Sequence, residues 1–438
     1  MIAIKAHFIS FGCKVNLYET ENMKTHFAAE GFDILSDEQD ADLYVINTCT
    51  VTSMSDKKIR QTLHRLRKEN PSSILALTGC FPQAFEEEAS RLEEADIITG
   101  AKDRSTLVST VKEFLLDRQR IIRVSPHLTG EPFEKMTNTA FPEKTRAFVK
   151  IQDGCDQFCS YCIIPTARGR IRSKPMKDLK QEVTALAQAG HKEIVLVGIN
   201  LSFYGKEFGL RLADAIELCC SADGVERVRL GSLEPEVISD EDIAHMARLD
   251  KLCPQFHLSL QSGCDRTLKA MNRKYTSEGY FSLVTRLRDA FPDCAVTTDI
   301  MVGFPGETEA DFEESLAFVQ KVGFSKVHVF PYSRREGTPA AQRSDQVSST
   351  VKTLRAKRMG QIATVSQHKF LQQQIGKTVP VLFERENCTD FHQGYAPNYT
   401  LVKIPSKMGE NSLRRQIFYV KIKSIHHDFC MGEIQNEI

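Results

Sequence analysis

The sequence predicts an α/β protein built of three parts: an N-terminal open parallel α/β sheet, a central partial (β/α)6 barrel and a small C-terminal β-barrel. Short apolar runs alternate with helical patterns over residues 1–115, and they do so again over residues 146–345. These two observations predict the parallel sheets. A third observation predicts the C-terminal barrel, because apolar and polar side chains alternate along the runs that follow residue 376.

The N-terminal part, residues 1–115, contains three apolar runs that each lead to a cysteine. The runs AHFISF, DLYVIN and SILALT precede Cys13, Cys49 and Cys80. The carboxyl ends of parallel strands lie at one edge of an open sheet, so we expect these three thiols to converge there. Cysteines also occur as small buried hydrophobic residues, but three repeats of the same placement favour a common site.

Residues 116–145 are polar and contain three prolines, and we expect them to form a linker. The central part, residues 146–373, carries six apolar runs separated by helical patterns. Six β/α units are fewer than the eight of a closed barrel, which predicts a partial barrel with its site at the carboxyl ends of the strands. The six runs are AFVKIQD, EIVLVGIN, RVRLGSL, FHLSLQS, AVTTDIMVGF and KVHVFPY.

Helices in the central part are predicted from the spacing of their apolar residues. Leu179, Val183 and Leu186 share one helical face, and Thr308 with Asp311 has the spacing of a capping box. A basic helix is expected to end this part, and residues 374–438 to form the small barrel.

The composition is that of an ordinary soluble protein, with 438 residues and a formal net charge of zero. No apolar run is long enough to span a membrane, and the N-terminus lacks a signal pattern, so we expect a cytoplasmic protein. Thirteen cysteines in such a protein indicate metal or redox chemistry rather than disulfides. From residue 346 onwards the chain has 13 Lys and Arg and only 7 Asp and Glu. This excess of basic residues fits either a solvated basic surface or a phosphate-binding region.

The first strand of the central part leads into KIQDGCDQFCSYCIIPTARGR, which holds Cys155, Cys159 and Cys162. A structural zinc site needs four ligands. A [4Fe–4S] cluster held by three thiolates keeps one iron without a protein ligand, and that iron can bind a small molecule. The loop therefore favours a cluster whose missing ligand is the substrate, with zinc as the alternative.

The spacing C-x-x-x-C-x-aromatic-C, with Tyr161 before the last cysteine, resembles the radical S-adenosylmethionine (SAM) enzymes. That resemblance implies that SAM chelates the open iron and is split to a 5′-deoxyadenosyl radical. It also implies SAM contacts at later strand ends, although ordinary turn chemistry explains each of them alone. The expected contacts are Tyr161, Gly198, Asn200, Ser232, Gln261 and Gly303.

Nearly the whole chain resembles the tRNA and ribosomal-protein methylthiotransferases. The matching segments are FGCKVNLYETE, VINTCTV, LTGCFPQ, DGCDQFCSYCIIPTARGRIRS, HLSLQSGCDRTLKAMNRKYT and TDIMVGFPGETEADF. The resemblance implies a first [4Fe–4S] cluster on Cys13, Cys49 and Cys80, and a second on the three-cysteine loop. It further implies that residues 374–438 are a TRAM RNA-binding domain, although GYAPNYTLVKIPSKMGENSLRRQ is a longer polar insertion than such a barrel usually has.

The segments GCKVNLYETE, GINLSFYG and YSRREGTP resemble the MtaB type within that family. This branch adds a methylthio group to C2 of N6-threonylcarbamoyladenosine next to the anticodon of tRNA. Two alternatives within the family are action on isopentenyladenosine in tRNA and action on a ribosomal protein. An alternative of another class is a non-enzymatic iron–sulfur carrier.

The partners that the resemblance implies are the anticodon stem-loop of tRNA, an external sulfur donor and an external electron donor. The clusters and SAM would carry the chemistry, so no side chain is assigned as catalytic, and we expect a monomer with no membrane partner. The basic side chains expected to bind RNA are Arg168, Arg170, Arg172, Lys352, Arg355, Lys357, Arg358, Lys403, Arg414 and Arg415.

Overall fold

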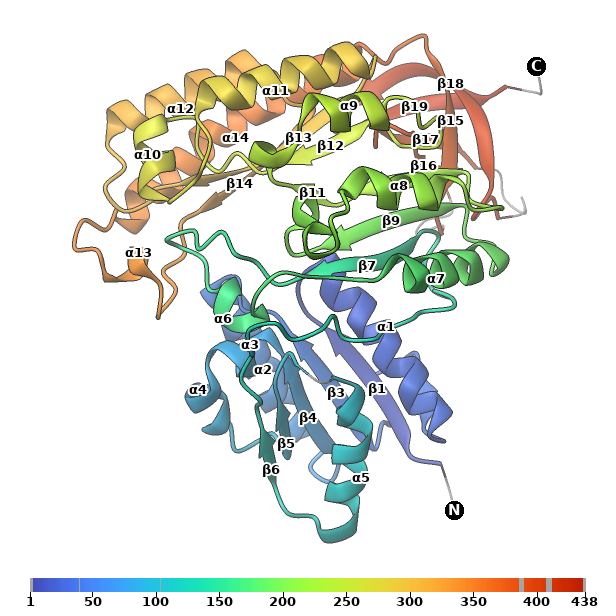
Figure 1. Ribbon diagram of the computed structural model, residues 1–438, viewed down its shortest axis with the longest axis vertical. Coiled ribbons are helices and arrows are strands. Elements are labelled where there is room, and N and C mark those ends of the chain that lie inside the picture. The colour runs from blue at the N-terminus through green and yellow to red at the C-terminus, as the bar shows by residue number, and fades with distance from the viewer. Residues whose placement is uncertain (1–2, 39, 103, 386–389, 407–411, 436–438) are drawn as a thin grey trace. The chain divides into compact units, whose positions relative to one another are not determined.

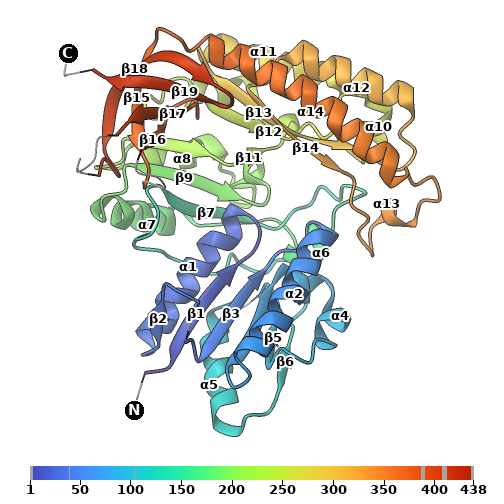
Figure 2. The same cartoon turned by 180° about the vertical axis from the view of Figure 1, so that it is seen from behind.

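The computed structural model describes residues 3–38, 40–102, 104–385, 390–406 and 412–435, and Figures 1 and 2 show it from opposite sides. The chain divides into two compact units, each described here by itself. The first unit comprises residues 1–138, 152–174 and 333–342, and the second comprises residues 139–151, 175–332 and 343–438. The finer domain boundaries expected from the sequence stay a prediction.

The first unit contains a six-stranded parallel sheet with the order β2-β1-β3-β4-β5-β6 (Figures 1 and 2). This confirms the open parallel sheet predicted for the N-terminal part. The strands are β1 (Lys5–Ser10), β2 (Asp33–Leu35), β3 (Leu43–Thr48), β4 (Ile74–Gly79), β5 (Ile97–Thr99) and β6 (Ile121–Arg123). The last of them lies in the stretch expected to be a linker, where its two isoleucines pair with β5.

Helices cover both faces of this sheet because alternate residues of its central strands point to opposite sides. Leu43 and Val45 of β3 pack in one apolar cluster with α1 and α5, whereas Tyr44 and Ile46 pack in another with α2, α3 and α4. The helices of the unit are α1 (Lys14–Ala29), α2 (Ser53–Glu69), α3 (Cys80–Ala84), α4 (Glu86–Ser90), α5 (Leu107–Asp117), α6 (Ile164–Arg168) and α13 (Pro339–Gln342).

The second unit contains the partial barrel, whose strands form two parallel sheets (Figure 2). All six predicted strands are present: β7 (Ala147–Asp153), β9 (Glu193–Gly198), β10 (Arg227–Leu230) continued by β11 (Ser232–Leu233), β12 (Gln255–Leu258), β13 (Ala295–Val302) and β14 (Lys326–Pro331). The third predicted strand divides at Gly231, so that β10 pairs with β9 and β11 pairs with β12. The last two residues of β7 belong to the first unit and pair there with β8 (Arg172–Ser173).

The predicted helices of the second unit are also present. Leu179, Val183 and Leu186 are buried, and Thr308 and Asp311 form the expected capping box of α12. The helices are α7 (Met176–Gln188), α8 (Leu212–Cys220), α9 (Asp240–Met246), α10 (Asp265–Ala270), α11 (Ser277–Ala290), α12 (Glu309–Val322) and α14 (Ser349–Gln372). Among the described residues no helix is both long enough and apolar enough to cross a lipid bilayer.

The C-terminal strands close into a five-stranded barrel with the order β15-β16-β17-β19-β18, as the alternating pattern predicts. The strands are β15 (Thr378–Phe383), β16 (Phe391–Tyr395), β17 (Leu401–Pro405), β18 (Ile417–His426) and β19 (Phe429–Ile434). The start of the polar insertion attaches this barrel to the strands of the partial barrel: the Tyr399 hydroxyl accepts a hydrogen bond from Arg146, and the Pro397 carbonyl accepts one from Arg229. Residues 407–411 of the insertion lie outside the described residues.

Candidate functional site

The cysteines of the N-terminal part follow three neighbouring strands. Cys13 precedes the first residue of α1, Cys49 follows β3, and Cys80 is the first residue of α3 directly after β4. Because β1 pairs with β3 and β3 with β4, the thiols converge at one edge of the sheet. Gly12 marks how closely they approach, since a Cβ atom there would lie 2.5 Å from the Cβ of Cys49.

Burial and mutual repulsion disfavour the thiolate forms of Cys49 and Cys80. Burial, followed by the charge of Cys80, raises the pKa of Cys49 to about 12. Burial likewise raises the pKa of Cys80, whereas Cys13 is exposed. Thiolates at buried positions are unfavourable unless positive charge compensates them, so Cys49 and Cys80 would ionise only beside a cation or a metal.

Two polar side chains hold the ends of the three strands together. The Asn16 amide donates hydrogen bonds to the carbonyls of Phe11 and Thr48, at 3.0 and 2.8 Å. The Thr48 hydroxyl donates to the carbonyl of Thr78 at 2.6 Å and accepts from the amide of Phe81 at 3.2 Å. These bonds fix the loops that carry the three cysteines.

The three-cysteine loop also belongs to the first unit and follows β7. Gly154 begins it with a φ of +72°, and a Cβ atom there would lie 1.8 Å from the carbonyl oxygen of Arg170. No residue other than glycine fits, because both the backbone conformation and the space exclude a side chain. A tight turn closes the loop, in which the Cys162 amide donates to the Cys159 carbonyl at 3.0 Å.

A segment of the first unit, residues 333–342, contacts both cysteine loops, and we refer to it as the strap. Arg335 donates to the Asp56 carboxylate at 2.7 Å and to the Thr50 hydroxyl at 2.6 Å, just beyond Cys49. The Ala340 amide donates to the carbonyl of Ser160 at 2.8 Å, within the second loop. The YSRREGTP motif therefore positions the site from a distant place in the sequence.

A buried arginine lies against the first cysteine set. Arg168 donates its Nε–H to the sulfur of Cys80 at 3.0 Å and its Nη2–H to the Asn16 side-chain oxygen at 2.7 Å. It also forms a bidentate ion pair with the buried carboxylate of Glu19, which Arg104 contacts at 3.1 Å. The sequence patterns did not single out Asn16 or Glu19, although Asn16 lies three residues after Cys13 and Glu19 three residues after Asn16, which is the signal of a shared helical face.

The expected SAM residues of the second unit lie at or just beyond the carboxyl ends of strands. Gly198 ends β9, Ser232 begins β11 beyond the break at Gly231, and Asn200, Gln261 and Gly303 follow the ends of β9, β12 and β13. Tyr161 is half-buried in the first unit.

Gln261 and Gly303 differ in what the structure offers a ligand. The Oε1 atom of Gln261 is buried and has no hydrogen-bond partner among the described residues, as expected of a group that awaits a ligand. The amide of Gly303 already donates to Glu307 at 2.9 Å, and a Cβ atom at this glycine would lie 2.4 Å from Cγ of Lys352. Internal packing alone therefore accounts for the glycine.

Three of the arginines expected to bind RNA are buried and already paired. Arg168 is fully buried, Arg172 pairs with Glu131 at 2.7 Å, and Arg355 pairs with Glu307 at 2.8 Å. The expectation of phosphate contacts is revised for these three, because a guanidinium group that is buried and fully engaged cannot reach a phosphate.

Four of the other basic candidates also have partners within the second unit. Arg358 pairs with two glutamates of α12, Lys352 donates to a backbone carbonyl, and Arg414 and Arg415 donate to carbonyls of residues 141–144. Arg170 and Lys357 are exposed, and Lys403 is half-buried with its ammonium 4.2 Å from the ring centroid of Phe429. These three are the best placed for RNA.

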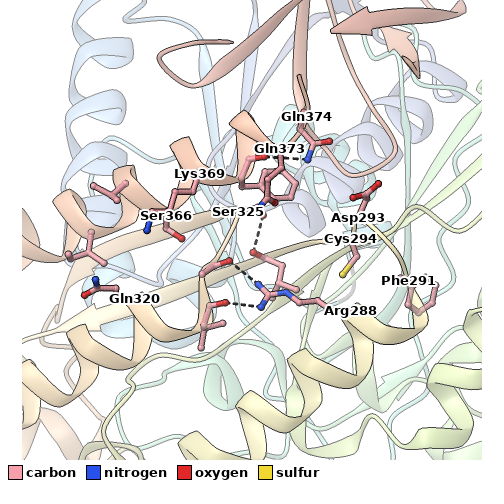
Figure 3. Close-up of a pocket in the computed structure, with 16 residues that line it drawn as sticks. Arg288, Phe291, Asp293, Cys294, Gln320, Ser325, Ser366, Lys369, Gln373 and Gln374 are labelled. Atoms are coloured by element: carbon pink, nitrogen blue, oxygen red, sulfur yellow. Dashed lines mark hydrogen bonds between the residues drawn. The ribbon is translucent and has the colours of Figure 1, made fainter. Parts of the chain in front are cut away.

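The second unit also has a cavity of about 480 Å³, whose lining Figure 3 shows. It is lined by residues near the amino ends of β13 and β14 and by the end of α14. Its Arg288 donates to the carbonyls of Val322 and Gly323, and its Ser366 donates to that of Phe324. These polar groups serve the packing of the helices, so the cavity is not the candidate site.

The donor chemistry of both cysteine sets fits an iron–sulfur cluster better than zinc. Each set supplies three soft thiolate donors, whereas a closed zinc site takes four ligands. Among the described residues no group of three or more His, Cys, Asp or Glu has coordinating geometry, so the preference for a cluster comes from the type and number of donors and not from their geometry. The buried guanidinium of Arg168 directs an N–H donor at the sulfur of Cys80, and such a donor suits an anionic cluster on the first set.

Two family models match the chain, the radical SAM superfamily over residues 149–319 and an uncharacterized protein family, UPF0004, over residues 5–100. The threonylcarbamoyladenosine tRNA methylthiotransferase MtaB of Bacillus subtilis is 38% identical over 432 residues, which are 97% of this chain and 95% of that relative. The MtaB of Thermotoga maritima is 37% identical over 421 residues, 96% of this chain and 94% of the relative.

A relative with another substrate in its name is similar to a comparable degree. The tRNA-2-methylthio-N(6)-dimethylallyladenosine synthase of Caldicellulosiruptor saccharolyticus is 37% identical over 391 residues, 86% of this chain and 82% of the relative. Among solved structures, the radical SAM methyltransferase TsrM from Kitasatospora setae has a TM-score of 0.57 at 13% identity and covers 78% of this chain and 77% of its own. That likeness shows the α/β fold alone.

Proposed function

Because this chain belongs to the radical SAM tRNA methylthiotransferase family, we propose that it adds a methylthio group to C2 of N6-threonylcarbamoyladenosine in tRNA. The observation that supports this most is the similarity along 97% of the chain to a relative named for that activity. The motifs GCKVNLYETE and YSRREGTP, which resemble the same branch, agree with it.

Membership of the radical SAM superfamily implies a [4Fe–4S] cluster and SAM, and we propose two clusters in this chain. When bound, these groups supply an open iron, a single electron, a radical and a methyl group. Cys155, Cys159 and Cys162 would hold the radical-generating cluster. Cys13, Cys49 and Cys80 would hold the other, to which an external donor brings sulfur.

In this chemistry the chain's own residues bind and orient the reacting groups, and they exclude water from them. The C2–H bond of a purine is not acidic enough for a side-chain base, so no general base is required among them. The turn from Cys159 to Cys162 and the bonds of Asn16 hold the thiols at the strand ends. The buried Oε1 of Gln261 can accept a hydrogen bond from SAM. The further proposed SAM contacts are Tyr161, Gly198, Asn200, Ser232 and Gly303.

Binding of tRNA is assigned to the closed C-terminal barrel, residues 374–438, and to the exposed basic side chains. Arg170, Lys357 and Lys403 can reach phosphates without breaking an internal ion pair of a buried group. An adenosine in the anticodon loop can be turned out of the stack without melting a duplex. Acting on tRNA with an external electron donor, the enzyme would work in the cytoplasm.

Nucleoside analysis of tRNA from a strain without the gene tests the proposal. The expected result is loss of the 2-methylthio derivative of N6-threonylcarbamoyladenosine and accumulation of its unmodified parent. The wild-type gene should restore the derivative, and the Cys155→Ala variant should not. An unchanged level of the derivative would contradict the proposal.

The same analysis decides between substrates, because the dimethylallyladenosine synthases are 34–37% identical to this chain. Loss of the methylthio derivative of isopentenyladenosine, with the threonylcarbamoyl derivative retained, would transfer the assignment to that substrate. Loss of neither derivative, in a protein that holds clusters but does not cleave SAM, would favour an iron–sulfur carrier.

A further inference from the structure

Arg168 is a charged side chain beside the first cysteine set with none of its surface exposed, as is its partner Glu19. It ends the short helix α6, six residues after Cys162 of the second set, yet its guanidinium group lies against Cys80 of the first set. Burying a guanidinium group is costly unless every donor finds a partner, so a fully buried arginine at this place needs an explanation.

The contacts of Arg168 account for each of its nitrogens. Nε donates to the sulfur of Cys80 at 3.0 Å, Nη1 and Nη2 bind the carboxylate of Glu19, and Nη2 also donates to Oδ1 of Asn16 at 2.7 Å. The Asn16 amide in turn bonds the loops after β1 and β3. One side chain therefore reaches a thiol directly and the backbone of the other two cysteine loops through Asn16.

The guanidinium groups around Arg168 are matched by carboxylates, so what distinguishes Arg168 is its direct hydrogen bond to the sulfur of Cys80. Glu19 is shared between Arg168 and Arg104, which contacts it at 3.1 Å. Asp153 lies 3.7 Å from Arg168 but closer, at 3.3 Å, to Arg172. Glu134 stands 3.5 Å from Arg104 and is partly exposed to solvent, which weakens its effect on the buried groups.

We propose that Arg168 is a positioning residue for the first cluster, which orients Cys80 and stabilises the reduced cluster by donating its Nε–H to the sulfur of Cys80. This inference rests on the proposed presence of a cluster on Cys13, Cys49 and Cys80. Hydrogen bonds and positive charge at cluster sulfurs stabilise the more negative oxidation state and raise the reduction potential. The role replaces the RNA contact that the sequence predicts for Arg168.

A second consequence is that the two cysteine sets are joined mechanically. Arg168 lies on α6, which follows the second loop directly, and that helix packs on α3, which begins with Cys80. The Cys155 amide donates to the carbonyl of Gly169, the residue after Arg168, at 3.0 Å. Displacement of one loop is therefore transmitted to the other through the backbone and side chain around Arg168.

The test measures the first cluster alone, in the full-length chain with Cys155→Ala, Cys159→Ala and Cys162→Ala. In this background, the midpoint potential and the electron paramagnetic resonance spectrum of the reduced cluster are recorded for Arg168, Arg168→Gln and Arg168→Lys. Arg104→Gln is the matched control, because it removes a positive charge from the same carboxylate without touching a thiol.

The expected result is a lower midpoint potential and an altered spectrum in Arg168→Gln at unchanged iron content. The midpoint potential of Arg168→Lys should lie between those of Arg168→Gln and the parent, because lysine retains the positive charge but not the planar guanidinium group with its several N–H donors. Arg104→Gln should shift the potential less than Arg168→Gln. An Arg168→Gln cluster with the potential and spectrum of its parent would overturn the proposal.

Two further outcomes are distinguishable from that one. If Arg168→Gln does not fold, as judged by circular dichroism, Arg168→Lys carries the test, and an unshifted potential in that variant would overturn the proposal. If the chain that lacks the second cysteine set but retains Arg168 holds no cluster at all, the proposal of two clusters is wrong, whatever the role of Arg168.

Discussion

Gly154 shows how a single residue can decide whether the second cysteine set forms. A Cβ atom at this position would lie 1.8 Å from the carbonyl oxygen of Arg170, in a backbone conformation that disfavours side chains. We therefore predict that Gly154→Ala abolishes cluster binding by the second loop, measured as loss of its iron and of SAM cleavage.

Gly190 is the matched control for that substitution. It also has a positive φ, of +84°, but a Cβ atom added there would meet no other atom within 4 Å. Gly190→Ala should cost only about 1–2 kcal/mol of stability and leave iron content unchanged. Equal iron content in the two variants would contradict the steric argument.

Cys49 leads to a prediction about pH. Its thiol has a pKa of about 12 instead of 9, chiefly because it is buried, and a cluster binds the thiolate. Loading of the first set must remove this proton, so cluster assembly on it should be faster at pH 9 than at pH 7.

That rate is measured from the charge-transfer absorbance during anaerobic reconstitution of the chain without the second set. The chain without the first set serves as the control for the pH dependence of the reagents. Assembly that does not accelerate with pH on the first set would contradict this prediction.

At the residue scale, the sequence reveals which residues can carry chemistry more reliably than it reveals which residues are buried. The convergence of Cys13, Cys49 and Cys80 follows from their shared placement after strands, which the pattern of apolar runs reveals. The role of Arg168 does not follow, because a charged residue in an arginine-rich segment gives no sign that it is buried. Only the fold brings it to Glu19, 149 positions earlier in the chain.

At the scale of elements, the strap ties the site together across the sequence. Arg335 pairs directly with the buried Asp56 and bonds Thr50, so its loss would leave a buried carboxylate without its ion-pair partner. We predict that Arg335→Ala destabilises the protein by about 3 kcal/mol and lowers the iron content of the first set. Thermal or urea denaturation and iron analysis measure the two effects.

Arg334→Ala controls for the loss of a positive charge from the strap. Arg334 is exposed, and exposed substitutions usually change stability by less than about 0.5 kcal/mol. If Arg335→Ala behaved like Arg334→Ala, the strap would have no part in holding the Cys49 loop.

The elements that the sequence missed are short or lie in polar surroundings. Strand β6 has three residues within a segment rich in charges and prolines, and such a length carries too little periodicity to detect. Strands β16 and β19 contain Gly394 and Gly432, where a Cβ atom would lie 2.4 Å from a Leu382 backbone atom and 2.5 Å from a Val420 side-chain atom. Close strand packing requires these glycines, and they interrupt the apolar alternation.

For the whole molecule, a net charge of zero conceals a division between its parts, because the region after residue 346 is basic and the rest is acidic. Association with tRNA should therefore weaken steeply as salt is raised. We predict that Arg170→Ala reduces the salt slope of tRNA binding by about 1, as expected for one lost phosphate contact.

Fluorescence anisotropy with a labelled anticodon stem-loop measures this slope. Arg91→Ala is the control, because Arg91 is also exposed and pairs with Glu87 as Arg170 pairs with Asp156, but it lies outside the second cysteine loop. A slope that falls equally in both variants would show that general charge, and not a contact of Arg170, determines the binding.

The central claim is that one chain holds two clusters, each on three cysteines. Mössbauer spectra with iron and sulfide analysis of anaerobically reconstituted protein test it most directly, on the wild type and on the two variants that each replace one cysteine set by alanine. The account predicts two [4Fe–4S] clusters in the wild type and one in each variant. A single cluster in the wild type, or zinc without sulfide on either set, would contradict it.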